Sequence, residues 1–450
     1  MHDQSVTPDE LPNPDQPQSA SPVTVSERFD SIDTLRGIAV LGILVMNIYG
    51  FAMSMAAYAN PLADGGTEWF NIGTWYFTHL IFDQKFMTIF SILFGAGLIM
   101  MSTRAESRGA KYAGVWFRRN FWLLLIGALH GYLIWFGDIL FSYALIGMLI
   151  FPLRKKKPRT LIIVGSLMLP IALLISFGGG IYVEELQASV AEIEQIQESG
   201  AQLSEEQATT LEEWQAMSVF MGPPDDMVRR DQEAYGGKSY TNIVVHRAPV
   251  VIGMQTQGIL AFLIWRVGGL MLIGMALMKL NVLSAERTVS FYRKMLLFGY
   301  GIGFPIMAYS IYFVTAHQWD HIFMFRIGMA PNYIGSVFVA MGHIAVVMLI
   351  VKTGVLKSLM RRFAAVGRMA FTNYLLHSII LTTVFYGYGF GLYGQIPRFW
   401  QMAFVVAVIG LQMVISPLWL QHYRFGPAEW LWRSLAYWRR QPMRRLPANR

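Results

Sequence analysis

The chain has 450 residues, of which 54% are hydrophobic and only 14% are charged, and its apolar runs repeatedly reach about 18 residues, the length that crosses a bilayer. This composition indicates a polytopic membrane protein. The absence of cysteine excludes disulfides, thiolate zinc sites and cysteine nucleophiles, and the formal net charge of +8 has to be explained by its distribution along the chain.

The first 27 residues are rich in Pro, Asp, Gln and Ser. They contain no basic region followed by an apolar one, which is the pattern of a cleaved signal peptide. We therefore expect residues 1–27 to form a disordered tail.

Hydropathy predicts an all-α bundle of about ten transmembrane helices. The predicted spans are 34–57, 80–101, 116–135, 138–153, 160–182, 258–281, 292–314, 331–351, 369–388 and 399–420.

The positive-inside rule gives the orientation of these spans. If the N-terminus is cytoplasmic, every inside segment is basic, including "RKKKPR" at 154–159 and the tail at 422–450. The four short outside segments, "NPLADGGTEW", "WFGD", "TAHQWDHIFMFRIG" and "YGYGFGLYGQIPR", hold two basic residues between them. Both termini are thus predicted to be cytoplasmic. The basic excess follows from topology, so nucleic acid is not an expected partner.

One outside segment is long and acidic. Residues 183–247 carry thirteen Asp or Glu against four Lys or Arg, with apolar residues at helical spacing. We expect an extracytoplasmic insertion at 183–250 with one or two amphipathic helices over the outer face. It separates two five-span halves, 28–182 and 251–421. A solvated insertion and a substrate lid are both open interpretations.

Polar side chains inside spans are costly, so they mark either functional sites or hydrogen bonds between helices. Arg36 and Asn47 are eleven residues apart, close to three helical turns, and so lie on one face about 16 Å apart along the axis. Asp33 is a helix neighbour of Arg36. This stripe predicts either a phosphate site at the mouth or an anchor at the lipid headgroups.

The ninth span carries a second stripe. Arg368 lies at its cytoplasmic end, and Asn373 and His377 share a face about 8 and 14 Å deeper. If the first and ninth helices are neighbours, the two stripes line one cytoplasmic pocket that ends at Asn47 and His377.

Two further clusters lie toward the outer side. His130 and Asp138 flank a short turn, where the carboxylate either orients the imidazole of a general base or caps the next helix. His79, Asp83 and Lys85 form the other cluster, which is either a site or an exposed pair.

Arg266 lies either within the membrane or at its outer edge, and the sequence supports both positions. No histidines or carboxylates have strong metal-ligand spacing, and no P-loop, dinucleotide fingerprint or nucleophile elbow is present. We therefore expect no metal.

Five segments of this chain carry a recognisable pattern: "RFDSIDTLRGIAVLGILVMNI" (28–48), "KFMTIFSILFGAGL" (85–98), "HGYLIWFGDILFSYALIG" (130–147), "GRMAFTNYLLHS" (367–378) and "FGPAEWLWRSLAYW" (425–438). The most specific is the closing Gly-Pro-x-Glu-Trp-x-Trp-Arg motif, which contains Glu429 and Arg433. These segments resemble the YeiB-type bacterial inner-membrane proteins of the domain of unknown function 418 family.

This family is distantly similar to membrane acyltransferases of the heparan-α-glucosaminide N-acetyltransferase type, through the opening "SxDTxRGIA" motif and the Asn that follows it. The resemblance implies that Ser31, Asp33, Arg36, Gly37 and Asn47 match. The nearest counterpart of that enzyme's active-site His is His79, at a different spacing, and His130 is its rival.

The expected function is therefore acyl transfer from cytosolic acyl-CoA, the donor substrate, to an extracytoplasmic or lipid-linked acceptor. We predict catalytic roles for Asn47, His79, His130, Asp138 and His377. Donor-binding roles are predicted for Arg36, Arg368, Asn373 and Arg433.

A small-molecule transporter or exporter is the alternative function, and a scaffold without a site is a third. The expected location is the bacterial inner membrane. The expected partners are the lipid bilayer and a small-molecule, glycan or lipid acceptor, and a homodimer stays open.

Overall fold

The computed structural model describes residues 30–445 except residue 222. The predicted disordered tail at 1–27 lies outside the described residues. All named elements in the described part are helices, which confirms the all-α membrane bundle.

The N-terminal half contains α1 (Asp30–Ala52), α2 (Ala56–Ala59), α3 (Trp69–Ile81), α4 (Lys85–Ser107), α5 (Ala113–Leu133), α6 (Leu140–Leu149), the 3₁₀ helix η2 (Phe151–Lys155) and α7 (Pro158–Glu198).

The C-terminal part of the chain follows after α8 (Glu205–Met221) and α9 (Pro224–Gly236). It contains α10 (Tyr240–Gln255), the π-helical turn η3 (Ile259–Leu263), α11 (Ile264–Lys279), α12 (Val289–Ala316), α13 (His321–Phe323), the π-helical turn η4 (Met324–Gly328), α14 (Ala330–Thr353), α15 (Lys357–Arg368), α16 (Ala370–Phe385), α17 (Arg398–His422) and α18 (Pro427–Tyr437).

All ten predicted spans coincide with helices, but they are not equally suited to crossing a bilayer. Within the described residues, seven helical segments are long and apolar enough to do so. The other three predicted spans correspond to α5, α6 and α16. With ten residues, α6 covers about 15 Å, roughly half of a bilayer core.

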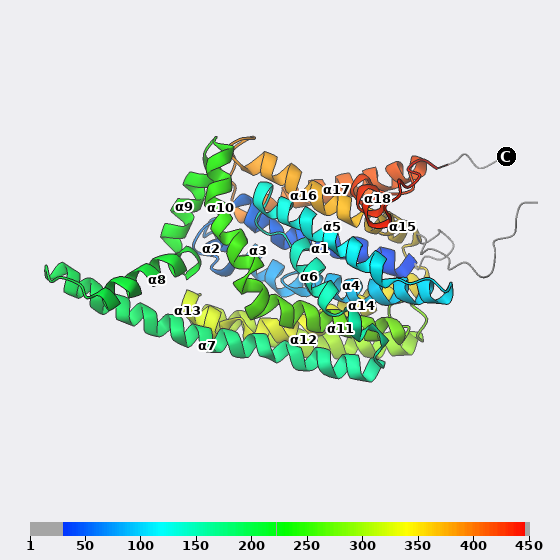
Figure 1. The fold of residues 1–450 in the computed structure, drawn as a ribbon, viewed down its shortest axis with the longest axis horizontal. Helices are drawn as coiled ribbons and strands as arrows, with labels where there is room; N and C mark the ends of the chain where they lie inside the picture. Colours follow the sequence, from blue (N-terminus) through cyan, green and yellow to red (C-terminus); the bar gives the residue numbers. More distant parts are fainter. Residues whose placement is uncertain (1–29, 222, 446–450) are drawn as a thin grey trace, which may run out of the picture.

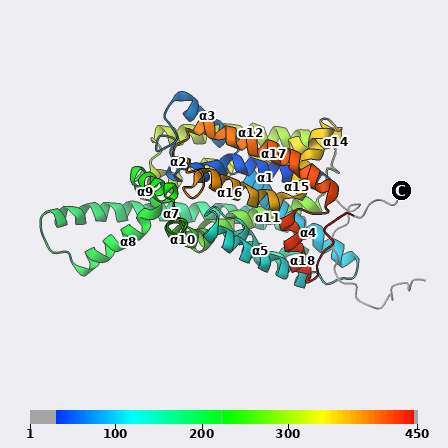
Figure 2. The same ribbon diagram turned by 90° about the horizontal axis from the view of Figure 1, so that it is seen from above.

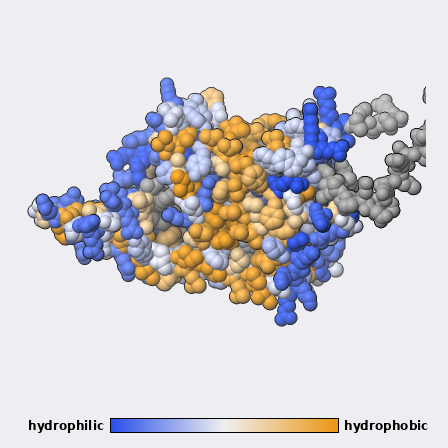
Figure 3. All heavy atoms as spheres, in the orientation of Figure 1, coloured by the Kyte–Doolittle hydropathy of each residue, from blue (hydrophilic) through white to orange (hydrophobic). Residues whose placement is uncertain are grey.

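The centre of the bundle is α1, which is surrounded by α4, α14, α15, α16 and α17 (Figures 1 and 2). Of its most apolar stretch, 83% is buried, against 17% for the peripheral α7. An apolar band covers the middle of the visible face, and hydrophilic residues gather at both ends (Figure 3). This distribution is the one expected when lipid surrounds the middle of the bundle.

The acidic segment after residue 183 forms a projecting arm. α7 continues as one helix to Glu198, and α8 returns beside it, so the pair extends beyond the bundle (Figure 1). α9 and α10 then lead back, and α10 packs against α5. The acidic segment therefore contacts the bundle at its beginning, where Glu184 pairs with Arg326, and in its later part, while its middle projects.

The closest backbone approach around α1 is its crossing with α15. A Cβ atom at Gly367 would lie 1.8 Å from the carbonyl oxygen of Asp33, and one at Gly37 would lie 1.9 Å from that of Phe363. Neither position has room for a side chain. This crossing brings the first turn of α1 against the end of α15, where Arg36 and Arg368 are found.

Candidate functional site

A cavity of about 240 Å³ lies between α1, α4, α5, α6, the α15–α16 junction and α18. On α1 its lining follows one helical face through Arg36, Val40 and Ile43. The cavity therefore begins at the N-terminal end of α1 and extends toward the middle of the bundle.

The mouth of the cavity is strongly basic. Its lining contains five arginines and two carboxyl groups, so the cationic groups outnumber the anionic ones by three. The Arg36 guanidinium donates to the Asp33 carboxylate at 2.7 Å, and the Arg119 guanidinium lies 3.7 Å from the centre of the Trp432 ring. The five arginines are Arg36, Arg104, Arg119, Arg368 and Arg433.

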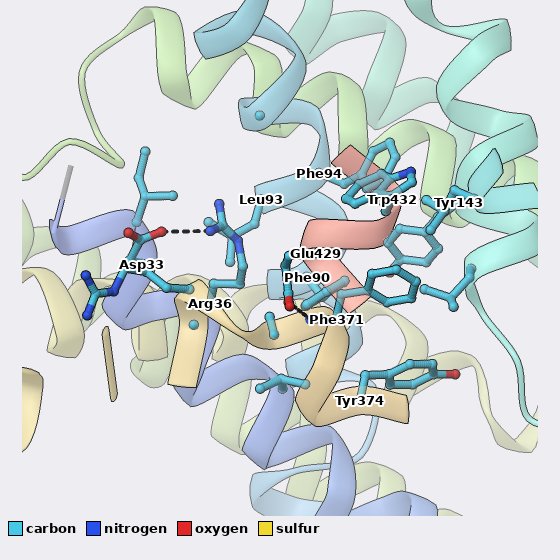
Figure 4. A pocket seen from close by; sticks show the side chains of 18 of the residues that line it. Asp33, Arg36, Phe90, Leu93, Phe94, Tyr143, Phe371, Tyr374, Glu429 and Trp432 are labelled. Carbon is cyan, nitrogen blue, oxygen red and sulfur yellow. Dashed lines mark hydrogen bonds and ion pairs between the residues drawn. The ribbon is translucent and has the colours of Figure 1, made fainter. Parts of the chain in front are cut away.

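The rest of the lining is apolar and aromatic. Figure 4 shows Asp33 and Arg36 on one side of the cavity and Tyr143, Phe371, Tyr374 and Trp432 on the other. Leu, Ile and Phe side chains fill the wall between them. A cavity of this kind suits an elongated ligand with an anionic head and an apolar end.

One wall is the C-terminal helix α18, which Glu429 fastens to the bundle. The Glu429 Oε1 atom accepts the amides of Phe371 and Thr372 at 2.7 and 3.1 Å, and Oε2 accepts the Thr372 hydroxyl at 2.5 Å. These are the orphan donors of the first turn of α16, so a distant carboxylate caps this helix. Burial raises the pKa of the Glu429 carboxyl above its usual value, and the bonds from Thr372 and Phe371 oppose that rise.

Replacing Glu429 by alanine is expected to lower the free energy of unfolding by about 1–3 kcal/mol, because two amides and a hydroxyl lose their acceptor. Trypsin should also cleave faster within 433–440, since α18 loses its attachment. Thermal unfolding in detergent and timed proteolysis measure these effects. The control is Glu212→Ala on the exposed arm, which removes a carboxylate without a recorded partner; equal effects of both variants would contradict the assignment.

Beyond the inner wall lies a buried chain of three polar side chains. His130 Nδ1 lies 2.8 Å from Asp138 Oδ2, and His130 Nε2 lies 2.8 Å from Ser378 Oγ. An ionised carboxylate only accepts hydrogen bonds, so Nδ1 carries the hydrogen and Nε2 accepts the serine hydroxyl. Asp138 is held in turn by the Phe141 amide, which donates to Oδ1 at 2.9 Å.

This chain adjoins the cavity through Tyr374. Tyr374 lines the cavity, and its ring centre is 5.4 Å from that of His130. Ile139 and Leu140, which directly follow Asp138, also line the cavity. The inner wall is thus built from residues adjacent to the His130, Asp138 and Ser378 chain.

Among the predicted site residues, Arg36, Arg368 and Arg433 meet at the cavity mouth. His130 and Asp138 are hydrogen-bonded to each other. Asn47 lies one turn beyond Ile43 on the same face of α1 as Arg36, outside the lining; it is half-buried and has no recorded hydrogen bond within the described chain.

Asn373 and His377 face α17 instead of the cavity. Asn373 Nδ2 donates to Ser416 Oγ at 3.1 Å, and His377 Nε2 lies 2.9 Å from Gln412 Oε1. These contacts are hydrogen bonds between helices. α1 and α16 are neighbours, which is the condition for a pocket lined by both polar stripes. On α16, however, the lining of the cavity extends to Tyr374 and does not include His377.

His79 also lies away from the cavity. Its Nδ1 and Nε2 atoms lie 2.9 and 3.1 Å from the carbonyl oxygens of Trp75 and Tyr58. A neutral imidazole donates from one nitrogen only, so the lone pair of the other faces a carbonyl oxygen and is closed off from a substrate. Asp83 is buried and accepts bonds from Tyr58 and Asn332, so it is not part of an exposed surface pair.

Sequence reasoning missed four residues of the site. Arg104 and Arg119 lie near the ends of the second and third predicted spans, where the positive-inside rule alone accounts for basic residues. Tyr374 and Ser378 flank His377 in "NYLLHS", and their spacing of four places them on one helical face. That spacing was the available signal. In the part of the chain that the structure describes, no three His, Asp or Glu side chains are grouped to hold a metal ion.

Comparison with known proteins shows that the chain is similar to bacterial proteins described as uncharacterized. Residues 277–439 match the family described as "Protein of unknown function (DUF418)". The chain is 32% identical over 439 residues to the uncharacterized protein YxaH of Bacillus subtilis (strain 168), covering 94% of this chain and 98% of the relative. It is also 32% identical over 414 residues to the uncharacterized protein YeiB of Escherichia coli (strain K12), covering 91% and 96%. No solved structure matches the chain.

Proposed function

The chain belongs to the YeiB-like DUF418 family, and the relatives compared above are described as uncharacterized. From the lining of its cavity, we propose that the protein transfers an acyl group from an acyl-CoA to an extracytoplasmic or lipid-linked acceptor. The observation that carries the proposal is the basic mouth and aromatic interior of one cavity, whose inner wall adjoins His130 and Asp138.

The mouth suits the phosphates of coenzyme A. Arginine forms paired hydrogen bonds with phosphate oxygens and keeps its charge in a half-buried site. Five arginines around one opening provide enough donors for a diphosphate and a further phosphate. The coenzyme occupies the opening, and its acyl thioester extends along Val40 and Ile43 toward Tyr374.

The interior suits the acyl group, because its Leu, Ile, Phe and Tyr lining excludes water from a thioester. At its inner wall, His130 can accept a proton while Asp138 stabilises the resulting imidazolium. Asn47 is one turn farther along the same face of α1, and its unpaired amide is a donor for the developing oxyanion.

The basic end faces the cytoplasm in this proposal, with the chain in the bacterial inner membrane and both termini inside. The start of α1 and the C-terminal helix α18 lie at this same end of the bundle (Figure 1). The donor then enters from the compartment that contains acyl-CoA, and the acceptor approaches from the lipid or the outer side.

Purified protein in nanodiscs is expected to bind acetyl-CoA or octanoyl-CoA and to transfer the labelled acyl group to a lipid or glycan extract. Failure to bind either donor, or movement of an unmodified solute in proteoliposomes without transfer, contradicts the proposal and favours a transporter.

Arg36→Ala is expected to weaken donor binding on the order of 10- to 100-fold, the value of one or two charge-assisted hydrogen bonds. Calorimetric titration at low salt measures the dissociation constant. The matched control is Arg293→Ala on the exposed start of α12, outside the cavity. Equal loss in both variants would show that general surface charge, and not the mouth, attracts the donor.

A further inference from the structure

We propose that Ser378 carries the acyl group as a covalent ester between donor and acceptor; this inference rests on the acyl transfer proposed above. Ser378 Oγ, His130 and Asp138 form a hydrogen-bonded series with distances of 2.8 and 2.8 Å. A nucleophile, a base and a carboxylate that orients the base are recognised by this geometry and not by their order in the chain.

The direction of the hydrogen bonds gives Ser378 its role. Asp138 fixes the hydrogen of His130 on Nδ1, so the only lone pair that His130 can use as a base is on Nε2. The recorded partner of Nε2 is the Ser378 hydroxyl. A proton taken up by His130 in this arrangement therefore comes from Ser378.

The position of Ser378 relative to the cavity supports contact with the acyl carbon. Ser378 is fully buried and lies one turn beyond Tyr374 on the same face of α16. The Tyr374 hydroxyl has two long hydrogen bonds, 3.3 Å to the Gly137 carbonyl oxygen and 3.4 Å from the Ile139 amide. In this proposal the Tyr374 ring rotates to connect the cavity to Ser378, which breaks these two long hydrogen bonds and shifts its packing against His130.

The first step acylates Ser378. The hydroxyl proton moves to His130 Nε2 as Oγ attacks the thioester carbonyl carbon, and a C–O bond forms while the C–S bond breaks. The coenzyme A thiolate leaves and takes the proton from Nε2. Asp138 remains ionised throughout and holds the imidazolium in place.

The second step returns the enzyme to its starting state. An acceptor hydroxyl or amine gives its proton to His130 Nε2 and attacks the ester carbonyl carbon. The bond from this carbon to Ser378 Oγ breaks, and Oγ recovers the proton from Nε2. No oxidant, reductant or metal is needed.

The test is acid-quenched incubation of the wild-type protein with octanoyl-CoA, without acceptor, followed by peptide mass spectrometry. We expect one octanoyl group on the peptide that contains Ser378, and free coenzyme A released in a burst of one per chain. A fluorophosphonate probe should label the same residue, and octanoyl-CoA should protect it.

Ser378→Ala is expected to bind octanoyl-CoA as tightly as the wild type, to carry no adduct and to transfer acyl groups at least about 1,000-fold more slowly. Ser378→Cys should trap a thioester, which provides a second measurement if the alanine variant unfolds. Ser416→Ala, which also removes a buried hydrogen-bonded hydroxyl, should leave acylation unchanged.

Transfer by the wild type without an adduct, or transfer retained in Ser378→Ala, would overturn the ester and leave acyl transfer standing. A wild type that neither binds the donor nor transfers the acyl group would overturn both proposals.

Discussion

His130→Gln is expected to slow acyl transfer by about 100- to 10,000-fold while the dissociation constant of octanoyl-CoA stays unchanged. Glutamine keeps a side chain of similar length and can still hydrogen-bond to Asp138, but it cannot accept a proton. Because His130 does not line the mouth, donor binding should survive. Initial transfer rates and calorimetric titration on the same preparation measure the two effects separately.

The control for this variant is His343→Gln. His343 is another histidine within the bundle, where it lies 2.7 Å from the Tyr300 hydroxyl and 3.1 Å from the Ile81 carbonyl oxygen, away from the cavity. It should lose stability without losing transfer per folded molecule. If both variants lower transfer in proportion to their stability, His130 has only a structural role.

Gly367→Ala is expected to lower the free energy of unfolding by about 1–3 kcal/mol or more and to weaken donor binding as well. The added methyl group would lie 1.8 Å from the Asp33 carbonyl oxygen and 2.7 Å from the Gly37 amide nitrogen, so α1 and α15 have to separate. Their separation also moves Arg36 and Arg368 apart at the mouth. Thermal unfolding in detergent and donor titration measure both effects.

Gly301→Ala is the matched control, because a Cβ there meets nothing within 4 Å on the exposed face of α12. The same substitution should be neutral or slightly stabilising, since alanine favours helix over glycine. A Gly367→Ala variant as stable as Gly301→Ala would contradict the close crossing.

The fold could be predicted where it depends on local composition. Apolar runs were enough to place a helix at each of the ten predicted spans, because the hydropathy of a segment acts on that segment separately, although only seven helical segments of the described chain are long and apolar enough to cross a bilayer. The end of α7 was less predictable. Its helix continues through an acidic stretch after residue 183, since the helical spacing of Leu186, Val190 and Ile193 persists and these residues are buried.

The sequence could predict only those parts of the site whose residues lie on one helix or close together along the chain. The face shared by Arg36 and Val40, and the closeness of His130 and Asp138, follow from short separations along the chain. The contact between His130 and Ser378 spans 248 residues and depends on α5 packing near α16, which no single-helix pattern reveals. For the same reason, the hydrogen bond between His377 on α16 and Gln412 on α17 could not be predicted from the sequence.

Arg266 has a consequence for the order in which the protein enters its membrane. Its guanidinium is fully buried and donates to the Tyr333 carbonyl oxygen at 2.9 Å and to the hydroxyls of Ser336 and Thr88 at 2.8 and 3.3 Å. Arg266 lies in the first turn of α11, and an arginine inside the membrane costs up to about 2.5–3.5 kcal/mol, the value at the centre of a helix. During synthesis from the N-terminus, α11 precedes α14, so two of these three acceptors do not yet exist. Arg266 can therefore complete its hydrogen bonds only after α14 has been synthesised, so we expect α11 to reach its final packing after α14 and not before it.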